Sequence, residues 1–387
     1  MSKNSFNNLL IKLLIIVPTL AISCSNATSD LKSHNQQNSS QSVLQTIKEP
    51  VPQPVKSPVP QPIKKIATET SEKTKSQTQN LKNIFNNCIL KNNIIECIDL
   101  DYANTNNIRQ TLNLWMPCKN KKVIEDCMSD KSYEVIVHVH GGGFVQGQKR
   151  AKSNNNLLQA GFAFASINYR LGAAGEFPNF LHDQKAAIRW LRANEKNYNL
   201  KTDQIGAYGE SAGGASVGLL AATSGLENYS INEQSIELEG NVGDNLEYSS
   251  DIQAIANYYG HSDTVKLTQQ ITGPRPPIVE NIFLSAISLI TYLGKGIPMP
   301  HLIIHGEADP VVYYEQSLIY LEKLKEIYPN KSVEYNLMTI ENGGHGGWSP
   351  SVIKETNNIM TNFFIRHIKM QANIPEEKSR IIINEYN

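Results

Sequence analysis

Apolar residues form short runs and helical stripes from residue 133 to the carboxyl end of the chain. The runs are rich in β-branched residues, which is typical of strands that are buried on both faces. Between the runs, apolar residues three and four positions apart predict amphipathic helices. Strands that alternate with helices indicate a mostly parallel, doubly wound sheet with helices on both faces, an α/β fold. Strands are expected at 133–140, 162–170, 204–208, 301–305 and 333–340, and helices at 179–198, 313–328 and 352–368.

The interval 224–300 has a less regular pattern. One further strand is expected at 252–259, and the rest is long enough to hold elements that cover a substrate. The residues from 83 to 387 are about 300 in number, a size that one α/β domain can fill. A single folded domain is therefore predicted over 83–387.

The first 82 residues lack this pattern. An apolar stretch at 13–22 follows Lys3 and Lys12 and is too short to span a bilayer, as in a secretory signal. Residues 25–81 are mainly Ser, Asn, Gln, Thr, Lys and Pro without an aromatic residue, and such a segment cannot bury a core. Its two similar proline-rich stretches favour polyproline II geometry, so a semi-rigid tether is expected over 24–82.

The apolar stretch ends in Leu20-Ala21-Ile22-Ser23-Cys24, which resembles the lipobox of bacterial lipoproteins. In such proteins the signal peptide, here residues 1–23, is removed and the cysteine is lipidated. Several acyl chains would hold Cys24 on a membrane almost permanently. The protein is therefore expected to be an exported bacterial lipoprotein that faces the periplasm or the cell surface. The alternative is an ordinary secretory peptide followed by an unrelated cysteine.

Four further cysteines, Cys88, Cys97, Cys118 and Cys127, lie early in the predicted domain. In an exported chain they are expected to form two short-range disulfides, Cys88–Cys97 and Cys118–Cys127. A two-residue hairpin turn at 92–93 would place Cys88 and Cys97 opposite each other at a non-hydrogen-bonded pair, a spacing that suits a disulfide. The alternative is a Cys₄ zinc site, but the short Cys-x₂-Cys spacing of structural zinc sites is absent from the sequence.

The best candidate nucleophile is Ser211. Gly209-Glu210-Ser211-Ala212-Gly213 matches G-x-S-x-G, follows the strand expected at 204–208 and precedes a run of small, helix-compatible residues at 212–222. In this strand–turn–helix setting the serine is held in a strained backbone conformation. The flanking positions require glycine, because a side chain at either position would collide with the neighbouring strand and helix.

A candidate oxyanion hole follows the strand expected at 133–140. The three glycines of His140-Gly-Gly-Gly143 let backbone N–H groups approach a substrate carbonyl without hindrance from side chains. The amides of Gly142, Gly143 and Ala212 are expected to stabilise a tetrahedral intermediate, each donor contributing about 10²–10³ in rate.

An acid and a base follow the serine in the order that this fold requires. Asp309 and His345 each come directly after an expected parallel strand, at the sheet edge where α/β proteins bind ligands. His345 is expected to act as the general base, and Asp309 to orient it and stabilise the imidazolium. Glu307 is the alternative acid. Three other histidines are expected to be structural: His138, His182 and His305.

These motifs resemble the α/β-hydrolase esterases of the hormone-sensitive-lipase group and the feruloyl- and acetylxylan-esterase-like group. The resemblance runs from about Tyr133 to the carboxyl end. Three segments, at 168–172, 183–184 and 209–217, also resemble type-B carboxylesterases, whose chains are larger. The motifs that carry the main resemblance are His140-Gly-Gly-Gly-Phe144, Asn168-Tyr-Arg-Leu171, Ala186-Ala-Ile-Arg-Trp-Leu-Arg192, Gly209-Glu-Ser-Ala-Gly-Gly214, His305-Gly-Glu-Ala-Asp-Pro310 and Gly344-His-Gly346.

The resemblance implies an α/β-hydrolase fold and a serine carboxylic-ester hydrolase that acts through an acyl-enzyme on short-chain or carbohydrate-linked esters. It implies no cofactor and no metal. The expected partners are a small-molecule or saccharide ester and, through the lipid anchor, a membrane, but no nucleic acid. Two alternatives are a catalytically inactive binding or adhesion protein, which typically loses a triad member, and a serine peptidase, which generally carries an added propeller or a large cap.

Overall fold

The computed structural model describes residues 85–128, 132–272, 278–371, 373 and 380–384. The expected signal peptide, the tether and Cys24 lie outside these residues. Within them, no helix is both long and apolar enough to cross a membrane. No cluster of three or more His, Cys, Asp or Glu side chains in the described part of the chain could hold a metal ion.

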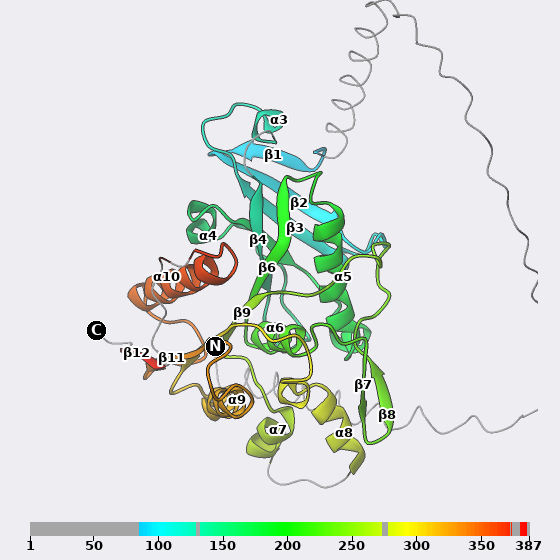
Figure 1. The fold of residues 1–387 in the computed structure, drawn as a ribbon, viewed down its shortest axis with the longest axis vertical. Helices are drawn as coiled ribbons and strands as arrows, with labels where there is room; N and C mark the ends of the chain where they lie inside the picture. Colours follow the sequence, from blue (N-terminus) through cyan, green and yellow to red (C-terminus); the bar gives the residue numbers. More distant parts are fainter. Residues whose placement is uncertain (1–84, 129–131, 273–277, 372, 374–379, 385–387) are drawn as a thin grey trace, which may run out of the picture.

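A ten-stranded sheet runs through the described residues (Figure 1). The first four strands in spatial order pair antiparallel, and every later pair is parallel. In spatial order the strands are β1 (Cys88–Lys91), β2 (Ile94–Asp101), β3 (Thr111–Pro117), β5 (Ala163–Ile167), β4 (Tyr133–Val139), β6 (Leu200–Glu210), β9 (Ala254–Tyr258), β10 (His301–Gly306), β11 (Tyr335–Glu341) and β12 (Arg380–Asn384).

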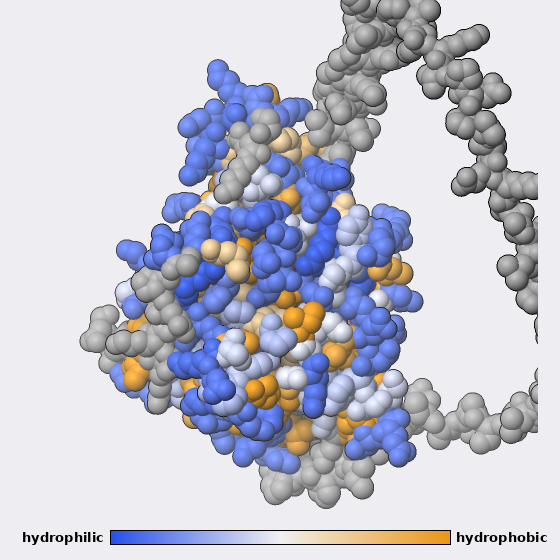
Figure 2. All heavy atoms as spheres, in the orientation of Figure 1, coloured by the Kyte–Doolittle hydropathy of each residue, from blue (hydrophilic) through white to orange (hydrophobic). Residues whose placement is uncertain are grey.

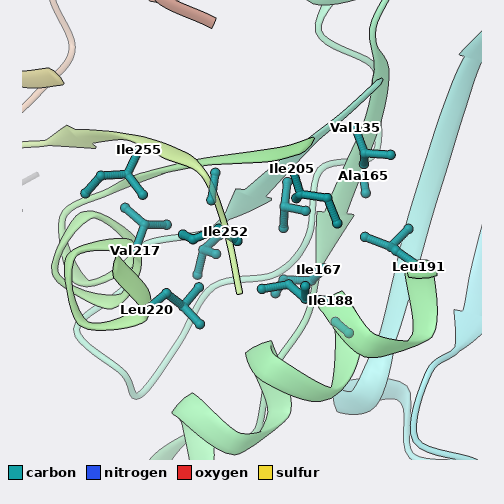
Figure 3. Close-up of a cluster of buried hydrophobic side chains, with 14 of the residues drawn as sticks. Val135, Ala165, Ile167, Ile188, Leu191, Ile205, Val217, Leu220, Ile252 and Ile255 are labelled. Atoms are coloured by element: carbon teal, nitrogen blue, oxygen red, sulfur yellow. The ribbon is translucent and has the colours of Figure 1, made fainter. Parts of the chain in front are cut away.

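Helices cover both faces of the sheet, which confirms the predicted fold class. Three helices, α5 (Asn179–Ala193), α6 (Ala212–Ala222) and α9 (Glu315–Ile327), pack on one face. The other face is covered by α4 (Asn155–Gln159) and α10 (Pro350–His367). Figure 3 shows part of the first layer, where Val217 and Leu220 of α6 and Ile188 and Leu191 of α5 lie against apolar side chains of the strands.

The antiparallel edge carries both disulfides. Asn92 and Asn93 have φ of 52° and 61°, the left-handed values of a type I′ hairpin turn, and they place Cys88 opposite Cys97. The Cα atoms of this pair are 4.1 Å apart, and a disulfide joins the two residues. A second disulfide joins Cys118 to Cys127, at the end of the short helix α3 (Ile124–Cys127). The predicted pairing is therefore the one that the structure contains.

The interval 224–300 holds several small elements besides the expected strand β9. A two-stranded hairpin, β7 (Asn228–Ile231) and β8 (Gln234–Glu237), is followed after β9 by α7 (Thr264–Thr272) and α8 (Ile278–Ala286). The hairpin and α8 lie side by side (Figure 1) and share a cavity of about 360 Å³. The 3₁₀ turn η4 (Leu289–Thr291) also lies in this interval. Two further 3₁₀ turns lie earlier in the chain, η2 (Ile108–Gln110) and η3 (Gly172–Gly175). Figure 2 shows that the face in view is mainly hydrophilic, with scattered hydrophobic residues.

Candidate active site

Ser211 lies on a sharp turn between β6 and α6. Its φ of 58° is in the left-handed region, where a residue with a side chain is strained by about 1–3 kcal/mol. The flanking glycines are required by space, because a Cβ on Gly209 would lie 2.4 Å from the carbonyl oxygen of Gly213. A Cβ on Gly213 would lie 2.1 Å from the carbonyl oxygen of Val139 in β4. The turn thus lifts the half-buried Ser211 hydroxyl above the carboxyl edge of the sheet.

The structure brings Ser211, His345 and Asp309 into one hydrogen-bonded chain. His345 Nε2 lies 2.9 Å from Ser211 Oγ, and His345 Nδ1 lies 2.7 Å from Asp309 Oδ2. The three residues follow β6, β11 and β10, whose carboxyl ends meet at one edge of the sheet. With Asp309 accepting from Nδ1–H, His345 presents an unprotonated Nε2 to the serine hydroxyl, the arrangement that a general base needs.

The carboxylate of Asp309 is buried and has several donors. Its Oδ1 accepts from the amides of Val311 and Val312 at 2.8 and 3.0 Å, and its Oδ2 faces His305 Nε2 at 3.1 Å. Burial by itself raises the pKa of Asp309, but the hydrogen bonds from the two histidines and the backbone outweigh it and hold the pKa at about 2. Asp309 is therefore ionised at neutral pH. Glu307, the alternative acid, is exposed to solvent.

The glycine loop after β4 packs against the turn that carries Ser211. A Cβ on Gly141 would lie 3.2 Å from the Cβ of Ser211. Gly142 and Gly143 have φ of 116° and 62°, values that favour glycine, and the carbonyl oxygen of Gly142 accepts from two amides of the following turn. Ala212 is the first residue of α6, where amides point out of the helix. The three predicted oxyanion-hole residues thus lie on two segments that meet at Ser211.

An ion-paired network includes Glu210, the residue before Ser211, and the sequence analysis did not predict it. Glu210 accepts from Arg150 at 2.5 Å and pairs with His138 Nε2 at 2.8 Å. Burial by itself raises the pKa of Glu210, but the charge and hydrogen bonds of His138 and Arg150 outweigh it and lower the pKa to about 2. His138 in turn contacts Ser166 Oγ. The sequence signal for it was His138, a polar residue between two valines of the strand expected at 133–140.

Two other motif residues have structural partners. Arg170 holds the buried carboxylate of Asp183 through several hydrogen bonds, including one of 2.8 Å from Nη2. His140 stacks on Tyr169 with ring centroids 4.4 Å apart, and the hydroxyl of Tyr169 donates to the backbone carbonyl of His140. Burial lowers the pKa of His140 to about 4, so its imidazole is neutral at pH 7. These contacts fix the loop that carries Gly142 and Gly143.

Solved structures of esterases share this architecture. A truncated form of a carbohydrate esterase from gut microbiota has a TM-score of 0.60 and 27% identity, and the match covers 70% of this chain and 95% of that one. A bifunctional GH43-CE protein of Bacteroides eggerthii has a TM-score of 0.58 and 29% identity, with 70% of this chain and 38% of that one covered. Esterase B from Lactobacillus rhamnosis, at 19% identity and a TM-score of 0.51, shares the fold. The fold is that of the α/β-hydrolases.

Curated relatives match about half of the chain. The probable carboxylic ester hydrolase LipM of Mycobacterium tuberculosis is 24% identical over 208 residues, which are 50% of this chain and 45% of that protein. Esterase LipC of the same organism is 27% identical over 237 residues, 57% of this chain and 54% of that protein. The chain thus spans about half the length of these two relatives. The family described as BD-FAE matches residues 123–324, more than half of the chain, and the protein therefore belongs to the BD-FAE family.

Proposed function

We propose that the protein is a serine carboxylic-ester hydrolase, with Ser211 as the nucleophile. The observation that carries the proposal is the unbroken chain from Ser211 Oγ through His345 to Asp309, with distances of 2.9 and 2.7 Å. Relatives and a solved structure that are named as a carboxylic ester hydrolase or as esterases support the same reaction class.

The reaction proceeds in two halves. Ser211 Oγ attacks the carbonyl carbon of the ester while His345 Nε2 takes the hydroxyl proton. The oxyanion of the tetrahedral intermediate is held by the amides of Gly142, Gly143 and Ala212. Collapse breaks the bond to the alcohol, which leaves with the proton from His345, and an acyl-serine remains. Water, activated by the same imidazole, then attacks the acyl group and releases the carboxylic acid and the free serine.

The proposed substrates are short-chain or carbohydrate-linked esters. Two structural neighbours above 25% identity support this proposal, one a carbohydrate esterase from gut microbiota and the other a bifunctional GH43-CE protein. Acetylated and feruloylated sugars are therefore the first substrates to assay, with nitrophenyl esters as simple references.

Covalent labelling tests the nucleophile and the reaction together. A fluorophosphonate probe should label the wild-type protein and leave Ser211→Ala unlabelled, and this variant should lose about 10⁴–10⁶ in turnover on nitrophenyl acetate while it remains folded. Substantial hydrolysis by pure Ser211→Ala protein would rule out the assignment. A wild-type protein that neither reacts with the probe nor hydrolyses any ester would favour an inactive binding protein, and hydrolysis of peptides alone would favour a peptidase.

We also propose that the enzyme acts outside the cytoplasm as a lipoprotein anchored through Cys24. The support is the lipobox-like sequence at 20–24 and the polar, proline-bearing composition of residues 25–81. Two disulfides in the described domain fit an oxidising compartment. The ester substrates would then be those of the periplasm or the cell surface.

A further inference from the structure

We infer that a cavity beside the triad binds the sugar part of an ester substrate, an inference that rests on the proposed esterase function. The cavity has a volume of about 400 Å³, which is within the range of about 300–1,000 Å³ usual for small-molecule sites. It lies between α4, the first half of α10 and the carboxyl ends of β6 and β9. This position is on the α4 and α10 side of the sheet, separate from the hairpin and α8.

Residues that adjoin the triad line this cavity, whereas Ser211, Asp309 and His345 themselves do not. Its wall includes Glu210, the residue directly before Ser211, together with Gly346 and Gly347, which directly follow His345. Tyr259 also lines it, and the ring of Tyr259 contacts the His345 ring with centroids 4.7 Å apart. A sugar seated in the cavity would therefore lie beside residues that adjoin Ser211 and His345 in the chain.

The chemistry of the wall suits a polyhydroxylated ligand better than an acyl chain. Asparagine side chains line it from α4 and α10, with tyrosine rings and Trp348 beside them. Ile353 provides the only aliphatic side chain among the lining residues, and it is 44% exposed. Within the described residues, neither the side-chain amide of Asn357 nor the hydroxyl of Tyr259 has a hydrogen-bond partner, so both are available to a ligand. Flat aromatic side chains and convergent amides together fit a sugar ring.

The charge of the wall points to a neutral sugar. Arg150 and Glu210 are the only charged residues that line the cavity, and they pair with each other at 2.5 Å. The pair leaves no net charge to attract a uronate or a phosphate. A ligand that gains its affinity from hydroxyl groups matches this wall, because hydroxyls both donate to and accept from amides.

The test uses two acetyl esters that differ only in their alcohol, xylose tetraacetate and 4-nitrophenyl acetate. Asn357→Leu removes the free amide while keeping a good helix former in α10, and Ile353→Trp narrows the mouth from an exposed helical position. Glu355→Ala, an exposed change on the same helix away from the cavity, is the matched control. For each variant, the ratio of kcat/KM on the sugar ester to kcat/KM on the nitrophenyl ester is compared with that of the wild type.

We expect this ratio to fall about five- to tenfold in Asn357→Leu, chiefly through KM, because one ligand hydrogen bond is lost. Ile353→Trp should lower it at least as much, and Glu355→Ala should leave it unchanged. An unchanged ratio in both cavity variants, or an equal loss on both esters, would overturn the sugar site while leaving the esterase intact. If wild-type protein shows no Ser211-dependent hydrolysis of either ester, the proposed function itself fails, and the two failures are thus distinguishable.

Discussion

His305 is the second histidine that contacts the carboxylate of Asp309. Its Nε2 lies 2.9 Å from the carbonyl oxygen of Val312, an atom that can only accept, so Nε2 carries a proton. That N–H also faces Asp309 Oδ2, while Nδ1 lies 2.6 Å from the hydroxyl of Ser317 in α9. His305 is fully buried and cannot touch a substrate. It is a positioning residue, which orients the carboxylate of Asp309 toward His345.

Two substitutions distinguish the effect of the His305 hydrogen bond from the effect of the space that its side chain fills. His305→Leu should lower kcat by about 10–100-fold with little change in KM, because Asp309 loses a donor and its orientation. His305→Gln places an amide N–H near the position of Nε2 and should recover most of the activity. Steady-state kinetics on nitrophenyl acetate, with thermal unfolding of each variant, checks both. Equal losses in the two variants would argue against this role.

Glu210 should make the free energy of unfolding depend on pH in the acid range. Its pKa is about 2 in the folded protein against an ordinary 4.5, so its contribution is present above about pH 4.5 and is lost as the pH falls through about 2. Glu210→Gln should therefore cost up to about 3 kcal/mol near neutral pH, and the difference from wild type should shrink between pH 4.5 and 2. Urea unfolding over this range measures it. A difference independent of pH would contradict the prediction.

The triad was predictable because each member follows a strand on a short, glycine-bearing motif. Ser211, Asp309 and His345 stand in such motifs, and the structure brings all three together. The supporting contacts could not be predicted, because they join residues far apart in the sequence. His138 and Glu210, for example, are 72 residues apart and meet only because β4 and β6 are neighbours in the sheet.

The parallel strands other than β12, and the long helices α5, α9 and α10, were predicted with boundaries near those observed. Of the antiparallel strands, β1 and β2 were expected only as the hairpin about residues 92–93, and β3 was missed. A break in register between Cys97 and Leu100 interrupts the alternation of β2. In β3 the polar Asn113 is buried, where it bonds the amide of Asp99 and the carbonyl oxygen of Arg150. The β7–β8 hairpin and β12 were also missed.

The Cys88–Cys97 disulfide should contribute to the stability of the protein and have little effect on its catalytic rate. The Cys88–Cys97 bond closes a loop of sequence separation nine, and in the chain-entropy account it stabilises the protein by about 2–3 kcal/mol. Replacing both cysteines by alanine should lower the free energy of unfolding by about that amount. The rate on nitrophenyl acetate at 25 °C should stay within about twofold of wild type, since β1 and β2 are separated from β6 by three strands. A large loss of turnover in the folded variant would show that the hairpin supports the site.

The proposed anchor can be tested separately from catalysis. Cys24→Ser removes the thiol that would be acylated, so labelled palmitate should appear in wild-type protein and not in the variant. The variant should accumulate as an uncleaved precursor or as a protein that no longer sediments with membranes. Its folded domain is unchanged, and its kcat on nitrophenyl acetate should match that of wild type. Absence of lipid on wild-type protein from a competent bacterial host would leave an ordinary secreted esterase.

The position of β1 decides how the domain would be presented on a surface. The chain enters the described domain at Phe85, next to β1 at one end of the sheet, whereas the triad follows β6, β10 and β11. In Figure 1, β1 lies near the top of the view, and α6, which begins next to Ser211, lies in the lower half. If Cys24 is lipidated, the anchored segment joins the domain at the β1 edge of the sheet and not at the strands that carry the triad. Long polymers such as decorated polysaccharides could then be deacylated along their length without having to come near the lipid surface.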